Sequence, residues 1–345
     1  VNQEPFENVK IIGSAQTGIV SLNITNSARQ AAMGNSGAAD PGCLTSFRSN
    51  PAAMEASGLA AYYNYRFMDY LESQSEGLYP EGAHSYSAGV IIGGGRMNLA
   101  MDYSRFEQGK FSGMRTVFIP EGYEDIAFEP YWHALTVASS FRLYRDLSGG
   151  AALKYQNRGG IPWFEYEGAF SVDLGLFYAM RGFLGRGPVR DRFRLGISFQ
   201  NTGSSLKVSD MEMELPRYLR VGLSYQMTGN TEEDEQFFRI VFSGEYRRYT
   251  NKEENYTAET DYYGLGLEGR VYQWIYLRAG GGNDPVYGQS NRFNPALGIG
   301  VDIPFSGFGL DLPLEMIIDY TCLFLEDSEY DNFLSISLTS SQPVF

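Results

Sequence analysis

The feature that most constrains the fold is a regular alternation of apolar and polar residues, which runs through most of the chain from Leu59 onward. About 14 segments show it, each of roughly eight to thirteen residues, separated by Gly, Pro, Asn and acidic clusters. In "RFRLGISFQ" the residues of one parity, from Phe193 to Phe199, are apolar, whereas Arg194 and Gln200 have the other parity. This period of two predicts strands, and helical periodicity is nearly absent, so we expect an all-β protein. The strands are expected to begin near Leu59, Ser85, Arg96, Trp132, Leu147, Ala169, Phe193, Tyr218, Phe237, Asp261, Ile275, Asn294, Leu314 and Asn332.

In the clearest of these segments the apolar parity carries no charged residue. A charged side chain on the lipid face of a barrel costs about 2 to 4 kcal/mol at the bilayer midplane. A register slip of one residue that moved five such charges outward would therefore cost on the order of 10 kcal/mol or more. The strand register is thus strongly specified if lipid surrounds the sheet.

A soluble double sheet or a propeller would show the same alternation, and it is the alternative to a membrane barrel. Three features favour the barrel. About fourteen strands close a lumen too wide for side chains alone to fill. The connections alternate between long (about 69–84, 107–130, 200–217 and 250–260) and tight (93–95, 145–146 and 272–274). Aromatic residues crowd the strand ends, as in the girdles at the two membrane interfaces of such barrels. These aromatic residues are Tyr62, Tyr63, Tyr65, Phe67, Tyr246, Tyr249, Tyr272, Trp274 and Tyr276. The predicted fold is an antiparallel transmembrane β-barrel of about 14 strands, formed by residues 59–345.

Composition excludes several other classes of protein. The formal net charge of -14 argues against nucleic acid as a partner, because phosphates would be repelled. The only cysteines, Cys43 and Cys322, lie far apart, which indicates neither a disulfide framework nor a metal site. The sequence contains no window of about 18 apolar residues, so it predicts no transmembrane helix. Residues Val1 to Lys10 lack the basic start and apolar core of a signal peptide.

The stretch before the alternation, residues 1–58, has too little apolar periodicity for a core of its own. Its part "SARQAAMGNSGAADPGCLTSFRSNPAAM" is rich in small residues, and its glycines permit tight turns. Such a segment can pack inside a wide barrel, where its backbone groups meet charged inward faces instead of lipid. We therefore expect residues 1–58 to form a plug. The inward charges could line an ion path, but we favour pairing among themselves and with the plug. They are Arg194, Arg220, Arg239, Arg247, Arg270, Arg278, Asp102, Asp173, Glu268, Asp302, Glu315 and Asp319.

The plug segment resembles a known family. "SARQAAMGNSGAAD" followed by "FRSNPAAM" is similar to the amino-terminal hatch of the FadL-superfamily barrels, and most similar to their PorV branch. The matching hatch residues include Arg29, Met33, Gly34, Asn50 and Pro51. The resemblance implies a 14-stranded barrel with its amino terminus in the periplasm and its long loops outside the cell. FadL-type members pass long-chain fatty acids or other hydrophobic molecules through a side opening. PorV-type members bind the pore of the type IX secretion system of Bacteroidota and carry cargo proteins with a sorting domain.

Chemistry-bearing motifs are few. The two histidines, His84 and His133, lie in a loop and at a strand start, with nothing to place either beside a nucleophilic serine. The acidic runs "TEEDEQ" and "KEEN" lack the spacing of a calcium loop. We expect no enzyme activity, no metal and no cofactor.

The longest outer loop, residues 111–132, decides between the two functions of the family. It offers apolar and aromatic side chains that could bind a partner: Phe118, Ile119, Tyr123, Ile126, Phe128 and Tyr131. A carrier of hydrophobic molecules needs an apolar pocket inside the barrel, for which the leading segment offers only Leu44, Phe47, Met54 and Leu59. The sequence therefore favours a PorV-type subunit in the outer membrane of a Gram-negative bacterium of the Bacteroidota, with a secretion pore and cargo as partners. The alternatives are a FadL-like transporter and a purely structural surface protein.

Overall fold

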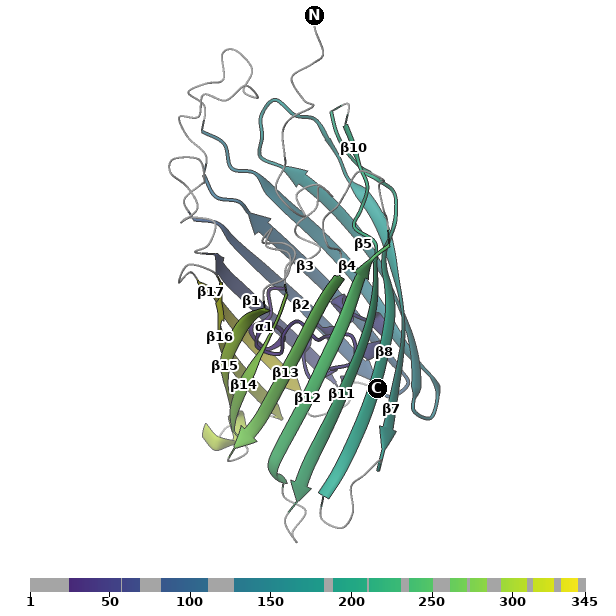
Figure 1. Cartoon of the computed structure of the whole chain (residues 1–345), viewed down its shortest axis with the longest axis vertical. Coiled ribbons are helices and arrows are strands. Elements are labelled where there is room, and N and C mark those ends of the chain that lie inside the picture. Colours follow the sequence, from purple (N-terminus) through teal and green to yellow (C-terminus); the bar gives the residue numbers. More distant parts are fainter. Residues whose placement is uncertain are drawn as a thin grey trace, which may run out of the picture.

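A computed structural model describes residues 25–56, 58–68, 82–110, 127–182, 189–209, 211–230, 236–250, 261–271, 274–283, 293–308, 313–325 and 330–340. Fourteen strands in this part of the chain close into one antiparallel barrel (Figure 1), because the first strand pairs with the last. The barrel strands are β1 (Leu59–Met68), β2 (His84–Gly94), β3 (Met97–Glu107), β4 (Tyr131–Tyr144), β5 (Leu147–Gly159), β7 (Ala169–Arg181), β8 (Val189–Gly203), β11 (Tyr218–Asn230), β12 (Gln236–Tyr249), β13 (Asp261–Val271), β14 (Ile275–Asn283), β15 (Phe293–Pro304), β16 (Leu314–Phe324) and β17 (Tyr330–Ser340). The predicted fold class is confirmed, and most strands begin within three residues of the expected positions.

The tightest connections lie at one end of the barrel and the longest at the other, although nine residues join β15 to β16 at the first end and five join β16 to β17 at the second. Residues 95–96 join β2 to β3, and residues 145–146 join β4 to β5, whereas 23 residues separate β3 from β4. We call the two ends the short-turn end and the long-loop end. A small sheet of β6 (Tyr166–Glu167), β9 (Leu206–Val208) and β10 (Met211–Met213) belongs to connections at the long-loop end.

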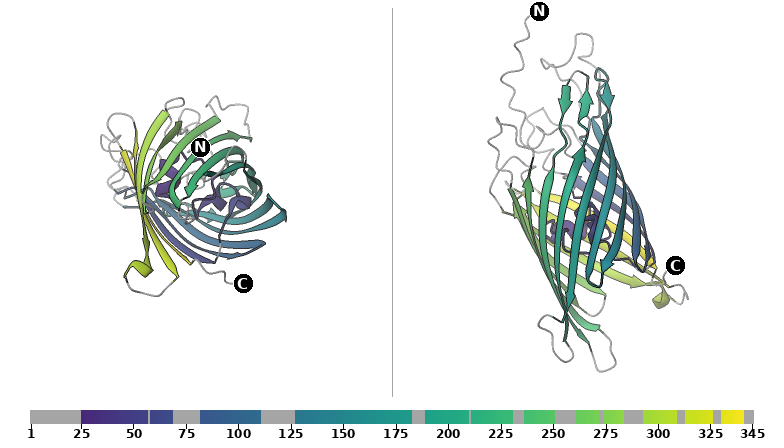
Figure 2. Two further views of the ribbon diagram at one scale, coloured as in Figure 1. Left: turned by 90° about the horizontal axis from the view of Figure 1, so that it is seen from below. Right: turned by 90° about the vertical axis from the view of Figure 1, so that its right-hand side faces the viewer.

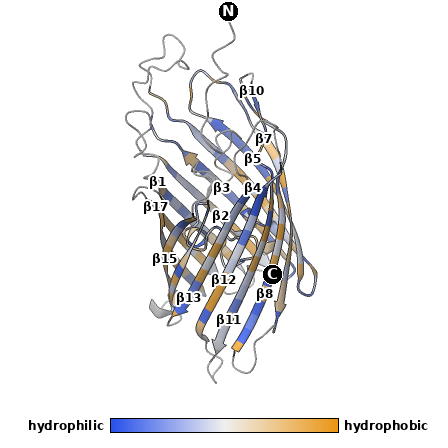
Figure 3. Ribbon diagram, viewed as in Figure 1, coloured by the Kyte–Doolittle hydropathy of each residue, from blue (hydrophilic) through white to orange (hydrophobic). Residues whose placement is uncertain are grey.

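The apolar parity of the strands faces outward. Leu265 is 62% exposed and Leu297 57%, whereas the inward Glu268 and Arg278 are 0% and 4% exposed. Figure 3 shows the apolar and polar residues alternating along the strands. An apolar outer surface with charges turned inward fits a lipid environment.

Four predicted orientations are wrong. Tyr249, expected in an aromatic girdle, has the inward parity of Glu245 and Arg247 on β12 and accepts a hydrogen bond of 2.8 Å from the buried Tyr218 hydroxyl. Tyr62 and Tyr276, expected in the aromatic girdles, are each only 6% exposed and point into the lumen. Their neighbours Tyr63 and Trp274 do face outward. Leu59, expected to serve an inner pocket, is 50% exposed. The cause is the period of two, which turns every second aromatic residue of a cluster inward.

Residues 25–56 lie inside the barrel (Figures 1 and 2), although few of them are large and apolar. We call them the inner segment. It contains α1 (Ala28–Ala32), η3 (Ser46–Arg48) and η4 (Pro51–Ala53), of which α1 is capped by the Ser27 side chain. Arg29, Gln30 and Asp40 are all less than 10% exposed, so the barrel wall buries them. No helix among the described residues is long and apolar enough to cross a membrane.

Candidate functional site

One part of the inner segment, around Met33, packs directly on the backbone of β13 and β14. At Gly266 a Cβ atom would collide with the backbone of Met33, and at Gly280 with the carbonyl oxygen of Ala32. Gly34 has a φ of +62°, which favours glycine, and its carbonyl oxygen accepts a hydrogen bond of 2.5 Å from the Tyr262 hydroxyl. Inward glycines on the wall therefore let α1 and the following turn lie directly against the strands.

An ionic network fixes the same region from the side chains. The Arg29 Nε donates to Glu268 at 2.8 Å, and the Arg29 Nη1 donates to Asp40 at 2.7 Å. Arg278 donates to Glu268 at 2.7 Å and to Asp319 at 2.6 Å. Burial disfavours the charged form of Arg29, but attraction from Asp40 and Glu268 outweighs it and holds the pKa of Arg29 well above its usual range. Arg29 is therefore a permanent cation that ties the inner segment to the wall.

The Asn50–Pro51 corner fixes the opposite side. The Asn50 Nδ2 donates to the carbonyl oxygens of Ala38 and Leu176, at 2.8 and 3.0 Å, and its Oδ1 accepts from the Ala52 N–H. A Cβ at Gly175 would collide with that Oδ1, so the corner sits directly on β7. The matched hatch residues thus all lie in buried contacts, with Arg29, Met33 and Gly34 on β13–β14 and Asn50 and Pro51 on β7.

A third tie lies between these two. The Glu245 carboxylate of β12 accepts a hydrogen bond of 2.8 Å from the Ala38 N–H and forms an ion pair of 2.9 Å with Arg220. Arg220 in turn donates to the Ser49 hydroxyl at 3.1 Å. From the sequence we expected the inward charges to pair with each other and with the inner segment. These contacts show such pairing for Arg220, Arg278 and Glu268.

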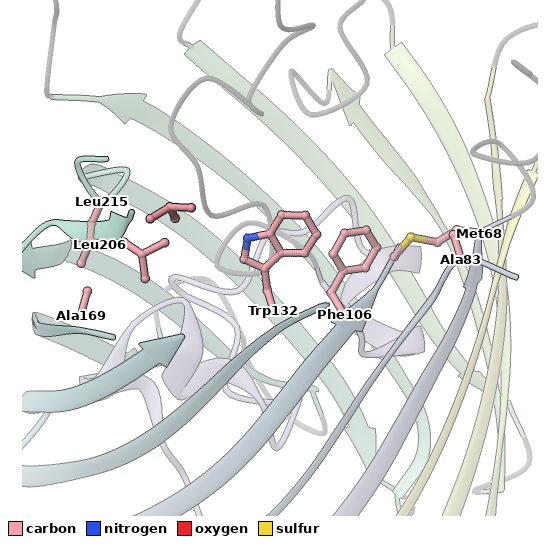
Figure 4. Packing of buried hydrophobic residues seen from close by; sticks show 8 residues of the cluster. Met68, Ala83, Phe106, Trp132, Ala169, Leu206 and Leu215 are labelled. Atoms are coloured by element: carbon pink, nitrogen blue, oxygen red, sulfur yellow. The ribbon is translucent and has the colours of Figure 1, made fainter. Parts of the chain in front are cut away.

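An apolar cluster lies inside the barrel at the long-loop end (Figure 4), and we call it the mouth cluster. Its aromatic centre is Phe106 of β3 stacked on Trp132 of β4, with ring centroids 5.4 Å apart. The mouth cluster consists of Met68, Ala83, Phe106, Trp132, Ala169, Leu206, Val208 and Leu215, each at most 4% exposed.

A cation borders the mouth cluster without a carboxylate partner among the described residues. The guanidinium of Arg158 lies 4.8 Å from the centre of the Trp132 ring, and its Nε has no hydrogen-bond partner. The nearby Tyr166 side chain packs at the edge of the cluster. A half-buried cation whose Nε is enclosed beside apolar side chains can bind the acidic group of an otherwise apolar molecule.

The sequence did not predict the mouth cluster. Its members are single residues at the ends of different strands or in connections, so no local pattern groups them. One signal was present, because Phe106 and Trp132 are large apolar residues on the parity that otherwise carries small or polar residues in their strands.

The loop residues expected to bind a partner are only partly described. Phe118, Ile119, Tyr123 and Ile126 lie outside the described residues. Phe128 packs edge-on against Trp163 at 5.0 Å, and the Tyr131 ring lies 4.1 Å from the Arg105 guanidinium. Both therefore contact other parts of this chain, and partner binding by the loop stays a prediction.

The histidines lie on the outer wall near the long-loop end. The His84 Nε2 lies 3.4 Å from Glu107, and His133 stacks on Tyr131 at 5.9 Å. Within the described ranges, no group of three or more His, Cys, Asp or Glu side chains could hold a metal ion.

Fold and interior together define a transmembrane β-barrel whose lumen holds its own amino-terminal segment. Among solved structures, the toluene transporter TodX from Pseudomonas putida is similar, with a TM-score of 0.54 at 10% identity over 91% of this chain and 98% of that chain. A FadL homologue from Pseudomonas aeruginosa (TM-score 0.48, 13% identity) covers 92% of this chain and 98% of its own. The toluene transporter TbuX from Ralstonia pickettii (0.48, 9%) covers 91% and 98%.

At these sequence identities the comparisons show similarity of fold alone, and this conclusion depends on the TodX structure. No protein-family model matches the sequence, and no curated protein matches it significantly. The secretion interpretation and the assignment to Bacteroidota find no support in these comparisons.

Proposed function

We propose that this barrel carries hydrophobic or amphipathic small molecules across the outer membrane of a Gram-negative bacterium. The mouth cluster is the observation that carries the proposal. Binding sites for apolar molecules are lined mainly by hydrophobic and aromatic side chains, and Phe106, Trp132 and Leu206 supply such side chains inside the barrel. Similarity of fold to TodX, described as a toluene transporter, agrees with it. This reverses the preference drawn from the sequence, which found too few apolar residues for an inner pocket.

Arg158 narrows the cargo to molecules with an acidic group. A hydrogen bond to a charged group contributes about 1.5–3 kcal/mol, which corresponds to roughly ten- to a hundredfold in affinity. A neutral molecule would leave the Arg158 Nε unsatisfied, so the cluster should prefer a carboxylate to the matching alcohol.

The leading segment has the role of a plug in this proposal. Residues 1–58 would close the lumen below the mouth cluster, and residues 59–345 would form the pore. Residues 25–56 support this through their buried ties to β7, β12 and β13. Residues 1–24 lie outside the described part of the chain, so the boundary between plug and barrel stays a prediction.

Tryptophan fluorescence tests the cargo site directly. The chain has three Trp residues, and we would keep Trp132 alone by changing Trp163→Phe and Trp274→Phe. In lipid nanodiscs, 12-bromododecanoate should quench Trp132 saturably and at lower concentration than 12-bromododecanol. Adding Arg158→Leu should raise the half-saturating concentration of the acid at least tenfold and change that of the alcohol little.

A matched variant keeps only Trp274, which is 57% exposed at the outer surface. Its quenching should rise without saturation as the probe enters lipid, and the acid and the alcohol should act alike. If Trp132 quenches in the same unsaturable way, the mouth cluster does not bind cargo.

The secretion-subunit hypothesis stays as the second candidate, and it depends on the aromatic residues of the loop 111–132. Purification of the intact protein from native membranes distinguishes the two. Stable co-purification of a much larger pore or of secreted cargo would favour the secretion role, whereas a solitary barrel with bound amphiphile would favour transport.

A further inference from the structure

Two cavities lie against the same side of the barrel wall, one on each side of α1. The lower cavity, about 150 Å³, faces the short-turn end and is lined in part by Asn64, Glu268, Arg278, Asp319 and Ser335. The upper cavity, about 10 Å³, faces the long-loop end and is lined in part by Arg66, Tyr262, Gly282, Leu323 and Phe333. Strands β1, β13, β14, β16 and β17 line both.

On β17 and β1 a single inward step separates the two cavities, and on β14 and β16 two such steps do. On β17, Phe333 lines the upper cavity, and Ser335, the next inward residue, lines the lower one. On β1 the same step runs from Arg66 to Asn64. On β16 the two steps include Thr321, whose hydroxyl donates to the Ala28 carbonyl oxygen at 2.8 Å. The barrier between the cavities is therefore α1 itself, a single helical turn.

The lower cavity is suited to water. Ser335, Ser337 and Thr339 place three hydroxyls in a row along β17. The ionisable groups of Arg29, Arg239, Arg278, Glu268 and Asp319 also line this cavity, among apolar side chains that include Leu44, Tyr62, Tyr276 and Ile317. A cavity of about 150 Å³ has room for several water molecules, which would hydrogen-bond to the hydroxyls and charged groups in its lining.

Hydrogen bonds, apolar packing and an ion pair hold α1 in place. The Ala28 N–H donates to the Ser335 hydroxyl at 2.8 Å, and the Ala28 carbonyl oxygen accepts from Thr321. Ala28 and Ala31 pack on Phe333. The strongest tie is the buried ion pair between Arg29 and Glu268.

We propose that the two cavities are halves of one passage for water and small inorganic ions, which α1 closes and the Arg29–Glu268 pair keeps shut. This passage follows β13–β17 and β1, whereas the mouth cluster is built mainly on β1–β4, β7 and β9. The inference is thus independent of the carrier proposal, and either can fail alone. The wall charges that hold the inner segment are the same ones that would give ions a polar path once α1 moves.

Planar-bilayer recordings in KCl test the gate. Arg29→Ala should raise the fraction of time in a small conducting state at least tenfold over the unaltered barrel. In the Arg29→Ala background, Ser337→Trp should abolish that conductance, because its side chain would fill the lower cavity. The matched control is Leu338→Trp, which should leave it unchanged because Leu338 faces outward with 40% exposure.

Two results would overturn the proposal. One is an Arg29→Ala barrel, shown to be folded by its heat-modifiable mobility, that conducts no more than the unaltered barrel. The other is an increased conductance that Ser337→Trp and Leu338→Trp reduce equally, which would place the path elsewhere.

Thiol labelling tests the water in the lower cavity without any substitution. Cys43 lines this cavity, whereas Cys322 has the outward parity of Tyr320 on β16. A charged, water-soluble methanethiosulfonate should modify Cys43 in the folded barrel in bilayers, and a membrane-permeant maleimide should be needed for Cys322. Equal resistance of both thiols to the charged reagent would contradict a water-filled cavity.

Discussion

At the scale of single residues, glycines in the barrel wall hold the inner segment as much as hydrogen bonds and ion pairs do. Because they carry no Cβ atom, the segment can lie directly against the strand backbone. Gly266 gives Met33 direct contact with the strand backbone, and Gly175 does the same for Asn50. The sequence showed these glycines only as interruptions of strand pattern. Their purpose could not be predicted, because each faces a residue more than a hundred positions away.

Valine at Gly266 should displace α1 from β13. Overpacking of a tight contact costs about 1–3 kcal/mol, so we expect Gly266→Val to lower the free energy of unfolding by that amount. The measurement is urea unfolding from lipid vesicles. Gly269→Val is the matched control on the same strand, because a Cβ there meets nothing within 4 Å, and it should change stability by less than about 0.5 kcal/mol. Equal effects of the two substitutions would argue that Gly266 matters for strand propensity and not for docking.

At the scale of elements, alternation predicted the strands well but not their irregularities. The pairing of β7 with β8 shifts between Val172 and Leu174, where Gln200 and Asn201 oppose Asp173 alone. Asn201 has a φ of +60°, and its N–H donates to Asp173 at 2.8 Å. The Asp173 carboxylate also pairs with Lys154 of β5 at 2.5 Å. A buried carboxylate therefore stabilises this bulge. The bulge could not be predicted, because no local sequence pattern indicates a contact among three strands.

Asp173→Asn should destabilise the barrel by about 3–5 kcal/mol, because it leaves the buried Lys154 ammonium without a counter-charge. Combining it with Lys154→Met should recover much of the loss. Urea unfolding of the two single variants and the double variant gives the coupling free energy. Additive effects would mean that the pair does not hold the bulge.

At the scale of the whole molecule, sequence and structure agree on the division of the wall into two faces. Strand number and the approximate start of each strand follow from alternation and turn residues, so they could be predicted. The mouth cluster and the two cavities could not, because they arise where residues from distant strands meet around the inner segment. The proposed carrier role depends on the mouth cluster, which no local pattern reveals, so the sequence favoured a partner-binding subunit instead.

The central claim is that lipid contacts the uncharged parity of the strands, while water and the inner segment occupy the other side. Nitroxide labels placed singly along β11 from residue 219 to residue 225 test it most directly. In bilayers the labels at 219, 221, 223 and 225 should collide with oxygen dissolved in lipid, and the label at 224 should not. Labels that are shielded from both oxygen and water at the apolar positions would mean a dry protein core there, and would contradict the account.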